Sequence, residues 1–449
     1  MSERRFDWFD AARLGLFVHW GPYSLAGVEA SWPIMVPDLR KLTPQPAIEE
    51  TDYVALAERF DPRAFDADEW VRRAQSAGMR YIVLTSKHHD GYCLFDAPGT
   101  DYKVTRSPYG GDLCAELAEA CDKAGMRLGF YFSPPDMHDP GYRDTSRPAS
   151  ENWTGEPQRA EWSGFLDRME AQLRKLMTDY GDIAVLWFDG LFDHARYDPE
   201  RMVGVVRELG PSTLVNDRLG PGDYVTPEQF FPSGIPVQRQ GPPADITEEQ
   251  IRGFFDLLLS DAPSEQIEQL LVMAQRSRFP TQALPAPESF QRWETCLTMN
   301  RTWAYNPTDT EWKSGHELVR TLVEVASRGG NLLLNVGPTP EGTFPPQAVE
   351  RLEAVGRFTE TFGEALFETR FGPVQGQDAV RSTERDGVVY LHLLEYEGPE
   401  VVVEGFDRPA ERVRRLSDGA NCEFRLDEGR LSVDVGASSE GQQVLAVEA

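Results

Sequence analysis

The sequence predicts an α/β protein: a (β/α)8-like (TIM-type) barrel followed by a C-terminal all-β sandwich domain. Two observations predict the barrel. Short apolar runs alternate with segments of helical periodicity, and the runs end in His, Tyr, Asp, Asn or Arg. A third observation predicts the sandwich, because beyond Phe371 the helical segments give way to short β-like segments separated by Asp-Gly or Glu-Gly pairs.

Seven strand-like runs are expected in the barrel, at residues 14–19, 81–86, 127–132, 183–189, 213–217, 294–298 and 331–336. The run 183–189 is short, apolar and closed by Gly190, which is typical of an inner strand of a parallel sheet. A doubly wound open sheet is the structural alternative. It is disfavoured because no Gly-x-Gly-x-x-Gly follows the first run.

The helices between these runs begin and end at recognisable residues. Asp66, with Glu69 as its capping-box partner, opens a helix that ends near Gly78. Apolar residues at helical spacing predict a second helix that ends at Gly125, and Asp198 before a proline opens a third.

We expect two domains, a catalytic barrel over residues 1–370 and a β-sandwich over 371–449, with a helical insertion at about 232–287. The insertion is enclosed by Pro/Gly/Gln-rich flanks and contains two amphipathic segments. Two interpretations of it stay open. It is either a surface hairpin without a role or an overhang of the site, since loops at that end of a barrel carry function.

Composition narrows the class of partner. The formal charge is 45 minus 73, or −28, and no Lys/Arg tract occurs, which argues against nucleic acid. Abundant aromatic and acidic residues suit a neutral carbohydrate better. The N-terminal residues lack the apolar segment of a signal peptide, and no run of 18 apolar residues follows, so we expect a soluble cytoplasmic protein without membrane contact. Five scattered cysteines predict reduced core residues rather than disulfides or zinc ligands.

Asp189 is the first candidate for chemistry. It follows the apolar run 183–188 and precedes Gly190, so a carboxylate stands where a buried strand should reach solvent. Burying an unpaired carboxylate is costly, which suggests a function for it. The alternative is an ordinary turn-forming or helix-capping Asp-Gly pair.

A second carboxylate is needed if the reaction is glycoside hydrolysis with retention, which uses a nucleophile and a general acid about 5 to 5.5 Å apart. Asp189 suits the nucleophile. Glu228, in the loop after the run 213–217, and Glu294, at the start of the next run, are both candidates for the acid/base. Their spacing in the sequence does not separate them.

Three histidines stand at predicted strand ends: His19, His88 and His89. They suit either metal ligation or hydrogen bonds to sugar hydroxyls. We predict no metal and no cofactor, because neighbouring histidines on an extended segment point to opposite faces and no H-x-H or H-E-x-x-H spacing occurs. Four aromatic residues are candidates for the apolar walls of a sugar site: Trp20, Trp32, Tyr131 and Trp187.

Eight motifs in order along the chain resemble those of the family 29 glycoside hydrolases, the retaining α-L-fucosidases. The resemblance covers residues 6 to about 370. Its motifs are Phe17-Val-His-Trp-Gly-Pro-Tyr-Ser24, Ser86-Lys-His-His-Asp-Gly-Tyr92, Gly129-Phe-Tyr-Phe-Ser133, Leu186-Trp-Phe-Asp-Gly190, Val215-Asn-Asp-Arg218, Thr226-Pro-Glu-Gln229, Trp293-Glu-Thr-Cys296 and Gly330-Asn-Leu-Leu-Leu-Asn-Val-Gly337.

The resemblance implies roles for individual residues. Asp189 matches the family's nucleophile, which forms a β-fucosyl-enzyme, and Glu228 matches the acid/base of members with a Thr-x-Glu segment. The residues that match those holding the fucose hydroxyls and methyl face are His19, His88, His89, Tyr131, Trp187 and Arg218. Arg218 near Asp189 would favour the ionised nucleophile.

One segment departs from the family pattern. Many members have Gly-Glu-Trp after the first strand, whereas this chain reads Glu29-Ala-Ser-Trp32. Trp32 keeps its place and Ser31 stands where the glutamate touches the sugar. Either Glu29 substitutes through a shifted loop, or the contact is absent.

The function implied is that of an exo-acting α-L-fucosidase that acts on fucosylated oligosaccharides or glycoconjugates without a cofactor. The linkage preference and a homo-oligomeric state are left open by the sequence. Three alternatives are an inactive carbohydrate-binding protein on the same scaffold, a glycosidase with altered sugar preference, and a metal-dependent hydrolase that uses His19, His88 and Asp189.

Overall fold

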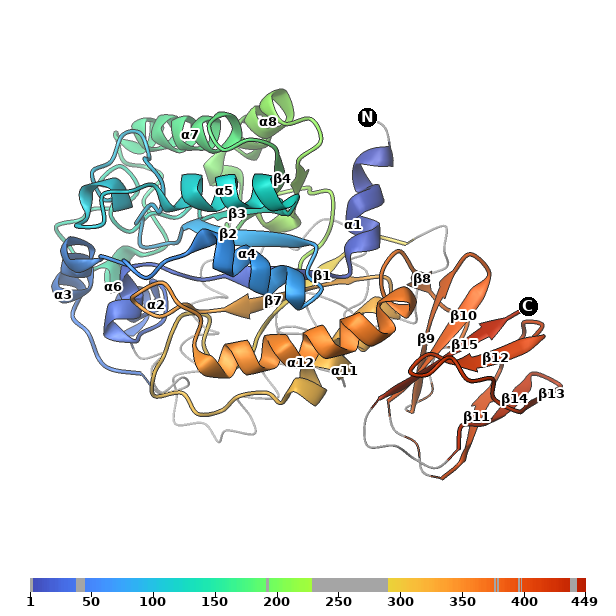
Figure 1. Cartoon of the computed structure of the whole chain (residues 1–449). Coiled ribbons are helices and arrows are strands. Elements are labelled where there is room, and N and C mark those ends of the chain that lie inside the picture. The colour runs from blue at the N-terminus through green and yellow to red at the C-terminus, as the bar shows by residue number, and fades with distance from the viewer. Residues whose placement is uncertain are drawn as a thin grey trace.

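A computed structural model describes residues 3–37, 45–190, 194–227, 290–374, 377, 379–394, 396, 398–436 and 442–449 (Figure 1). Its first domain contains a curled sheet of seven parallel strands in the order β5-β4-β3-β2-β1-β7-β6. The strands are β1 (Leu14–Val18), β2 (Tyr81–Lys87), β3 (Arg127–Phe132), β4 (Ile183–Phe188), β5 (Leu214–Val215), β6 (Glu294–Thr298) and β7 (Asn331–Val336). All seven predicted runs therefore form strands.

Tyr224 and Val225 lie at the eighth strand position. Tyr224 forms a parallel bridge with Asn216 beside β5, and Val225 forms one with Trp293 beside β6. The Val225 carbonyl accepts the Glu294 N–H at 2.9 Å. These bridges connect the two ends of the sheet, so the predicted barrel is confirmed and its shortest strand position is one that the sequence analysis did not identify.

The bounds of the helices are α1 (Asp7–Ala12), α2 (Trp32–Met35), α3 (Glu50–Ala55), α4 (Ala67–Ser76), α5 (Leu113–Ala124), α6 (Ala149–Asn152), α7 (Trp162–Thr178), α8 (Pro199–Leu209), α11 (Gly315–Ala326) and α12 (Pro346–Phe362). Helices α4, α5, α7, α8, α11 and α12 cover the outside of the strands, whereas α2, α3 and α6 lie together at one end of the barrel and α1 lies at the other (Figure 1). The predicted caps are present at α5, where Gly125 has φ +65°, and at α8, where Asp198 accepts the Arg201 N–H. At α4 the Asp66 cap is confirmed, but the capping box is wrong, because the Glu69 carboxylate pairs with Arg73 at 2.6 Å.

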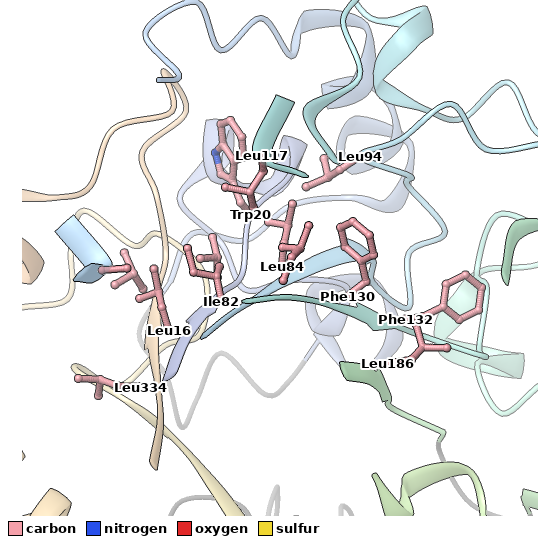
Figure 2. Packing of buried hydrophobic residues seen from close by; sticks show 14 of the residues in the cluster. Leu16, Trp20, Ile82, Leu84, Leu94, Leu117, Phe130, Phe132, Leu186 and Leu334 are labelled. Carbon is pink, nitrogen blue, oxygen red and sulfur yellow. The ribbon is translucent and has the colours of Figure 1, made fainter. Parts of the chain in front are cut away.

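Two separate cores result from the alternation of side chains along the strands. Outward residues such as Leu84 pack under the helices, with Leu94 and Leu117 close by (Figure 2). Inward residues such as Phe17 and Val185 fill the barrel itself. The inward set reaches the C-terminal ends of the strands with Tyr131 and Trp187, and this alternation therefore aims aromatic rings into the site.

The C-terminal strands form two antiparallel sheets, β12-β15-β10-β9-β8 and β11-β14-β13, over one shared core. They are β8 (Arg370–Phe371), β9 (Val380–Arg385), β10 (Val388–Leu393), β11 (Glu400–Glu404), β12 (Arg412–Arg415), β13 (Phe424–Asp427), β14 (Arg430–Asp434) and β15 (Gln443–Glu448). Asp386 and Gly387, with φ of 52° and 84°, make the tight turn between β9 and β10. The predicted sandwich is confirmed.

The sandwich packs beside α11 and α12 of the barrel (Figure 1). Glu324 on α11 is buried and pairs with Arg328 and with Arg381 of β9.

In the described part of the chain no helix is long and apolar enough to cross a membrane. The five cysteines are free, and four of them are buried, as expected of core residues. The predicted insertion at 232–287 lies outside the described residues.

Candidate active site

Asp189 directly follows β4 at the C-terminal end of the barrel. Its backbone N–H donates to the Phe132 carbonyl at 3.2 Å, which continues the β3–β4 pairing by one residue. Its side chain is 17% exposed. The Tyr131 hydroxyl donates to Oδ2 at 2.9 Å, and Arg218 Nη1 donates to Oδ1 at 3.1 Å. The carboxylate is thus held from two sides and still reaches the surface, which a simple turn residue does not require.

The surroundings of Asp189 favour its ionised form. Burial alone would raise the pKa of this carboxyl. The positive charge of Arg218, the electrostatic interaction with His89 and the hydrogen bond from Tyr131 together outweigh burial, so the pKa lies below its usual value. The Arg218 guanidinium also lies 4.8 Å from the centre of the Trp187 ring. Asp189 is therefore a carboxylate at neutral pH, as a nucleophile must be.

His19 and His89 lie near this carboxylate as neutral rings, and His88, also neutral, lies against both of them. His19 donates from Nδ1 to Asn335 Oδ1 at 2.7 Å, and His89 Nδ1 lies 2.7 Å from Ser133 Oγ. The Ser133 hydroxyl donates to a carbonyl, so His89 Nδ1 is the donor and Nε2 an acceptor, 3.6 Å from Asp189 Oδ2. Burial lowers the pKa of His19 and of His89 to about 4.

The expectation that His88 and His89 point to opposite faces is wrong. Strand β2 ends at Lys87, and a turn follows in which the Gly91 N–H donates to the His88 carbonyl. The alternation of an extended chain therefore does not apply to the pair. Their ring centroids lie 4.4 Å apart, and His88 stacks on Tyr131 at 5.3 Å while His89 approaches Asp189.

Two of the predicted aromatic walls lie beside Asp189. The Tyr131 and Trp187 rings stack at 5.5 Å, and both belong to the barrel interior. Trp32 lies further out, with its ring 6.1 Å from His89. The prediction that Trp20 forms a wall of the site is wrong. Its ring packs on Trp70 between the strands and helices, and the residue is 2% exposed.

Trp303 is an aromatic neighbour of the site that the sequence analysis missed. It follows β6 by five residues and is half-buried, with its ring 5.0 Å from His19 and 6.1 Å from Phe17. The only available signal was its place after a predicted strand end. Trp303 adds a third aromatic surface to those of Tyr131 and Trp187.

Glu294 lies inside the barrel and not at its mouth. It is the first residue of β6 and is 0% exposed. Its carboxylate accepts hydrogen bonds from the Tyr81 hydroxyl and from Trp187 Nε1, the latter at 3.0 Å. Burial raises its pKa to about 7, although these donors and Tyr224 lower it. Through the hydrogen bond from Trp187 Nε1, Glu294 supports the Trp187 ring from inside the barrel. Glu228 lies outside the described residues.

In the segment that departs from the family pattern, Glu29 and Ser31 both form hydrogen bonds within the protein. Ser31 Oγ lies 2.6 Å from His88 Nδ1 and accepts the Asp90 N–H at 2.7 Å. Glu29 accepts the backbone N–H groups of Trp303 and Ala304. Each of the two Glu29 carboxylate oxygens accepts one of these bonds, so the Glu29 side chain is engaged with the Trp303 loop and is 5% exposed.

Among the described residues no group of three His, Cys, Asp or Glu side chains is arranged to hold a metal ion. The Nδ1 atoms of His19, His88 and His89 bond to Asn335, Ser31 and Ser133 respectively, and these contacts fix the rings without a metal. The absence of a metal and of a cofactor stays a prediction. Dialysis against a chelator tests it through the activity that remains.

Arg218 sets the ionisation of Asp189, and its removal should be visible in the pH dependence. In Arg218→Met the carboxyl loses its nearest cation, so its pKa should rise by about 1 to 3 units. The acidic limb of the kcat/KM profile should then move to higher pH, because less Asp189 is ionised at each acidic pH. Arg218→Lys keeps the charge and should move the limb less. An unmoved limb in the Met variant would contradict this role.

An ionised carboxylate among neutral histidines and aromatic rings, at the C-terminal end of a parallel barrel, is the arrangement expected of the nucleophile in a barrel-type glycoside hydrolase. The chain belongs to the alpha-L-fucosidase family, whose model matches residues 2–241 and 258–364.

Individual relatives agree with this membership. Tissue alpha-L-fucosidase of Mus musculus is 25% identical over 417 residues, which cover 86% of this chain and 77% of the mouse protein. The solved structure of alpha-L-fucosidase isoenzyme 1 from Paenibacillus thiaminolyticus is 28% identical, with a TM-score of 0.80 and 99% of each chain covered. The Thermotoga maritima alpha-fucosidase in complex with fucose is 25% identical, with a TM-score of 0.74 and coverage of 98% and 96%.

Proposed function

We propose that this chain is an exo-acting α-L-fucosidase that hydrolyses terminal α-L-fucosyl linkages with retention of configuration. The observation that carries the proposal is the state of Asp189, a partly exposed carboxylate kept ionised by Arg218 and Tyr131 at the barrel mouth. The family membership supports fucose as the sugar. Fucosylated oligosaccharides or glycoconjugates are the proposed substrates.

The proposed reaction has two steps. In the first, Asp189 bonds to the anomeric carbon while Glu228 protonates the departing glycosidic oxygen, and a β-fucosyl-aspartate forms. In the second, Glu228 acts as a base and takes a proton from water, whose oxygen displaces Asp189 and releases L-fucose. Two inversions at the same carbon retain the configuration.

The choice of Glu228 over Glu294 rests on the contacts of Thr226, which precedes Glu228 in the sequence, and on the contacts of Glu294. Arg218, which binds Asp189, also donates to the Thr226 carbonyl at 3.2 Å and to its Oγ1 at 3.1 Å. Glu228 follows Thr226 by two residues, a reach of at most about 7 Å of chain. Glu294 is enclosed in the barrel and committed to Tyr81 and Trp187, so a leaving group has no route to it.

Sugar recognition is assigned to the neutral histidines and the aromatic rings. The Nε2 atoms of His19 and His89 are acceptors, which suits the hydroxyl groups of a sugar. Tyr131, Trp187 and Trp303 offer apolar surface to its C–H groups. Trp32, 6.1 Å from His89, is proposed to contact the outer part of the substrate.

An aryl α-L-fucoside tests the function. The enzyme should release the phenol and L-fucose, and NMR recorded within the first minutes should detect the α-anomer before mutarotation. Binding of fucose without phenol release would favour the inactive carbohydrate-binding alternative. Release of the β-anomer first would contradict retention.

The cytoplasmic location stays a prediction, while the linkage preference and the oligomeric state are left open by the sequence. The free cysteines among the described residues are compatible with a compartment that keeps thiols reduced. Hydrolysis of a panel of α-1,2-, α-1,3/1,4- and α-1,6-linked fucosides would establish the linkage.

A further inference from the structure

Glu29 is a buried carboxylate whose hydrogen bonds lead to the backbone of a distant loop. It is 5% exposed. One carboxylate oxygen accepts the N–H of Trp303 at 2.7 Å, and the other accepts the N–H of Ala304 at 2.8 Å. Two consecutive amides therefore share one carboxylate, although the two segments lie 274 residues apart in the sequence.

The charge of Glu29 depends on these amides. Burial raises the pKa of its carboxyl to about 7, while the bonds to Ala304 and Trp303 act in the opposite direction. Bonds from N–H groups to a carboxylate are stronger than those to a neutral oxygen. The loop and the carboxylate thus stabilise each other, and losing one acceptor would leave a buried N–H without a partner.

The same loop meets the sugar site through Trp303. The Trp303 carbonyl accepts a hydrogen bond from Asn335 Nδ2 at 2.7 Å, and Oδ1 of that same Asn335 accepts the His19 Nδ1–H at 2.7 Å. The Trp303 backbone is therefore held at its N–H by Glu29 and at its carbonyl by Asn335. Its ring is left 5.0 Å from the His19 ring.

We propose that Glu29 is a positioning residue for the sugar site, which holds the Trp303 loop so that the Trp303 ring lies beside His19. This inference rests on the proposed function. Ser31 stands where many family members have a glutamate that touches the sugar, and it bonds to His88. Glu29, two residues earlier, is buried and acts through the backbone of the Trp303 loop.

A double-mutant cycle tests whether Glu29 acts through Trp303. The variants are Glu29→Gln, Trp303→Ala and the double variant. A glutamine keeps the size of the side chain but offers one acceptor oxygen for two N–H groups. We expect Glu29→Gln to raise KM about tenfold with a smaller change in kcat, since substrate contact is weakened without removal of a reacting group. In the Trp303→Ala background the same change should raise KM less than twofold.

Glu324→Gln is the matched control. Glu324 is a buried carboxylate at the junction of barrel and sandwich, bonded to Arg328 and Arg381. Its replacement should lower the thermal midpoint and leave KM unchanged. The comparison separates the effect of losing a buried charge from the effect of displacing the Trp303 loop. If Glu29→Gln does not fold, the cycle is run with Glu29→Asp, whose shorter side chain keeps the charge and reaches the amides less well.

Calorimetric binding of L-fucose is measured on every variant beside the kinetics. A wild-type chain that binds fucose without hydrolysing the aryl fucoside would defeat the proposed function, while the cycle in Kd would still test Glu29. Losses that multiply in the double variant, or an unchanged KM and Kd in the single Glu29 variant, would overturn the positioning role.

Discussion

Asp189→Ala should lower kcat for an aryl α-L-fucoside by roughly 10⁴-fold, because the first step then lacks its nucleophile. The protein should keep its fold, since Asp189 contributes a partly exposed side chain at a strand end. Steady-state kinetics measures the loss, and the thermal midpoint of the variant controls for unfolding.

Azide provides the positive control for this variant. The alanine leaves room beside Arg218 for a small anion, which can attack the anomeric carbon in place of the carboxylate. Activity should partly return as the azide concentration rises, with β-fucosyl azide as the product. A variant that keeps the wild-type kcat would remove Asp189 from the mechanism.

Glu228→Ala should have the second largest effect, and one that depends on the leaving group. A general acid contributes about 10²- to 10⁴-fold, and it is needed most where the departing oxygen is a poor leaving group. Fucosyl oligosaccharides should therefore lose far more activity than activated aryl fucosides. Parallel measurement of kcat/KM on both substrates reveals the difference.

Glu294→Gln is the comparison for the Glu228 variant. Glutamine retains an acceptor for Trp187 Nε1, so the ring should stay in place and both substrates should lose activity by a similar, smaller factor. A selective loss on poor leaving groups in Glu294→Gln, with equal losses in Glu228→Ala, would transfer the acid/base role to Glu294.

The strands of the barrel were predictable because a buried strand requires a short run of apolar residues, which is visible in the sequence. The runs 127–132, 294–298 and 331–336 coincide with β3, β6 and β7. The run 213–217 yields only the two residues of β5, because the Asn216 side chain bonds both the N–H and the carbonyl of Phe188 in place of backbone pairing. Tyr224–Val225 is too short to produce a periodicity.

The site was predictable to the extent that strand ends converge. Asp189, His19, His88 and His89 stand at such ends, and the structure brings them together. Trp20 also stands at a strand end, but its ring points to the core between strands and helices. This orientation depends on packing against Trp70. The contact between Glu29 and the Trp303 loop depends on the complete fold and leaves no local signal.

The covalent bond to Asp189 is the most direct test of the account. A 2-deoxy-2-fluoro-fucosyl fluoride should react with the enzyme and then hydrolyse slowly, because the fluorine destabilises both transition states while fluoride leaves readily. Mass spectrometry of the digested protein should place one fluorofucosyl group on the peptide that contains Asp189. A label on any other residue, or inactivation without a covalent adduct, would contradict the mechanism.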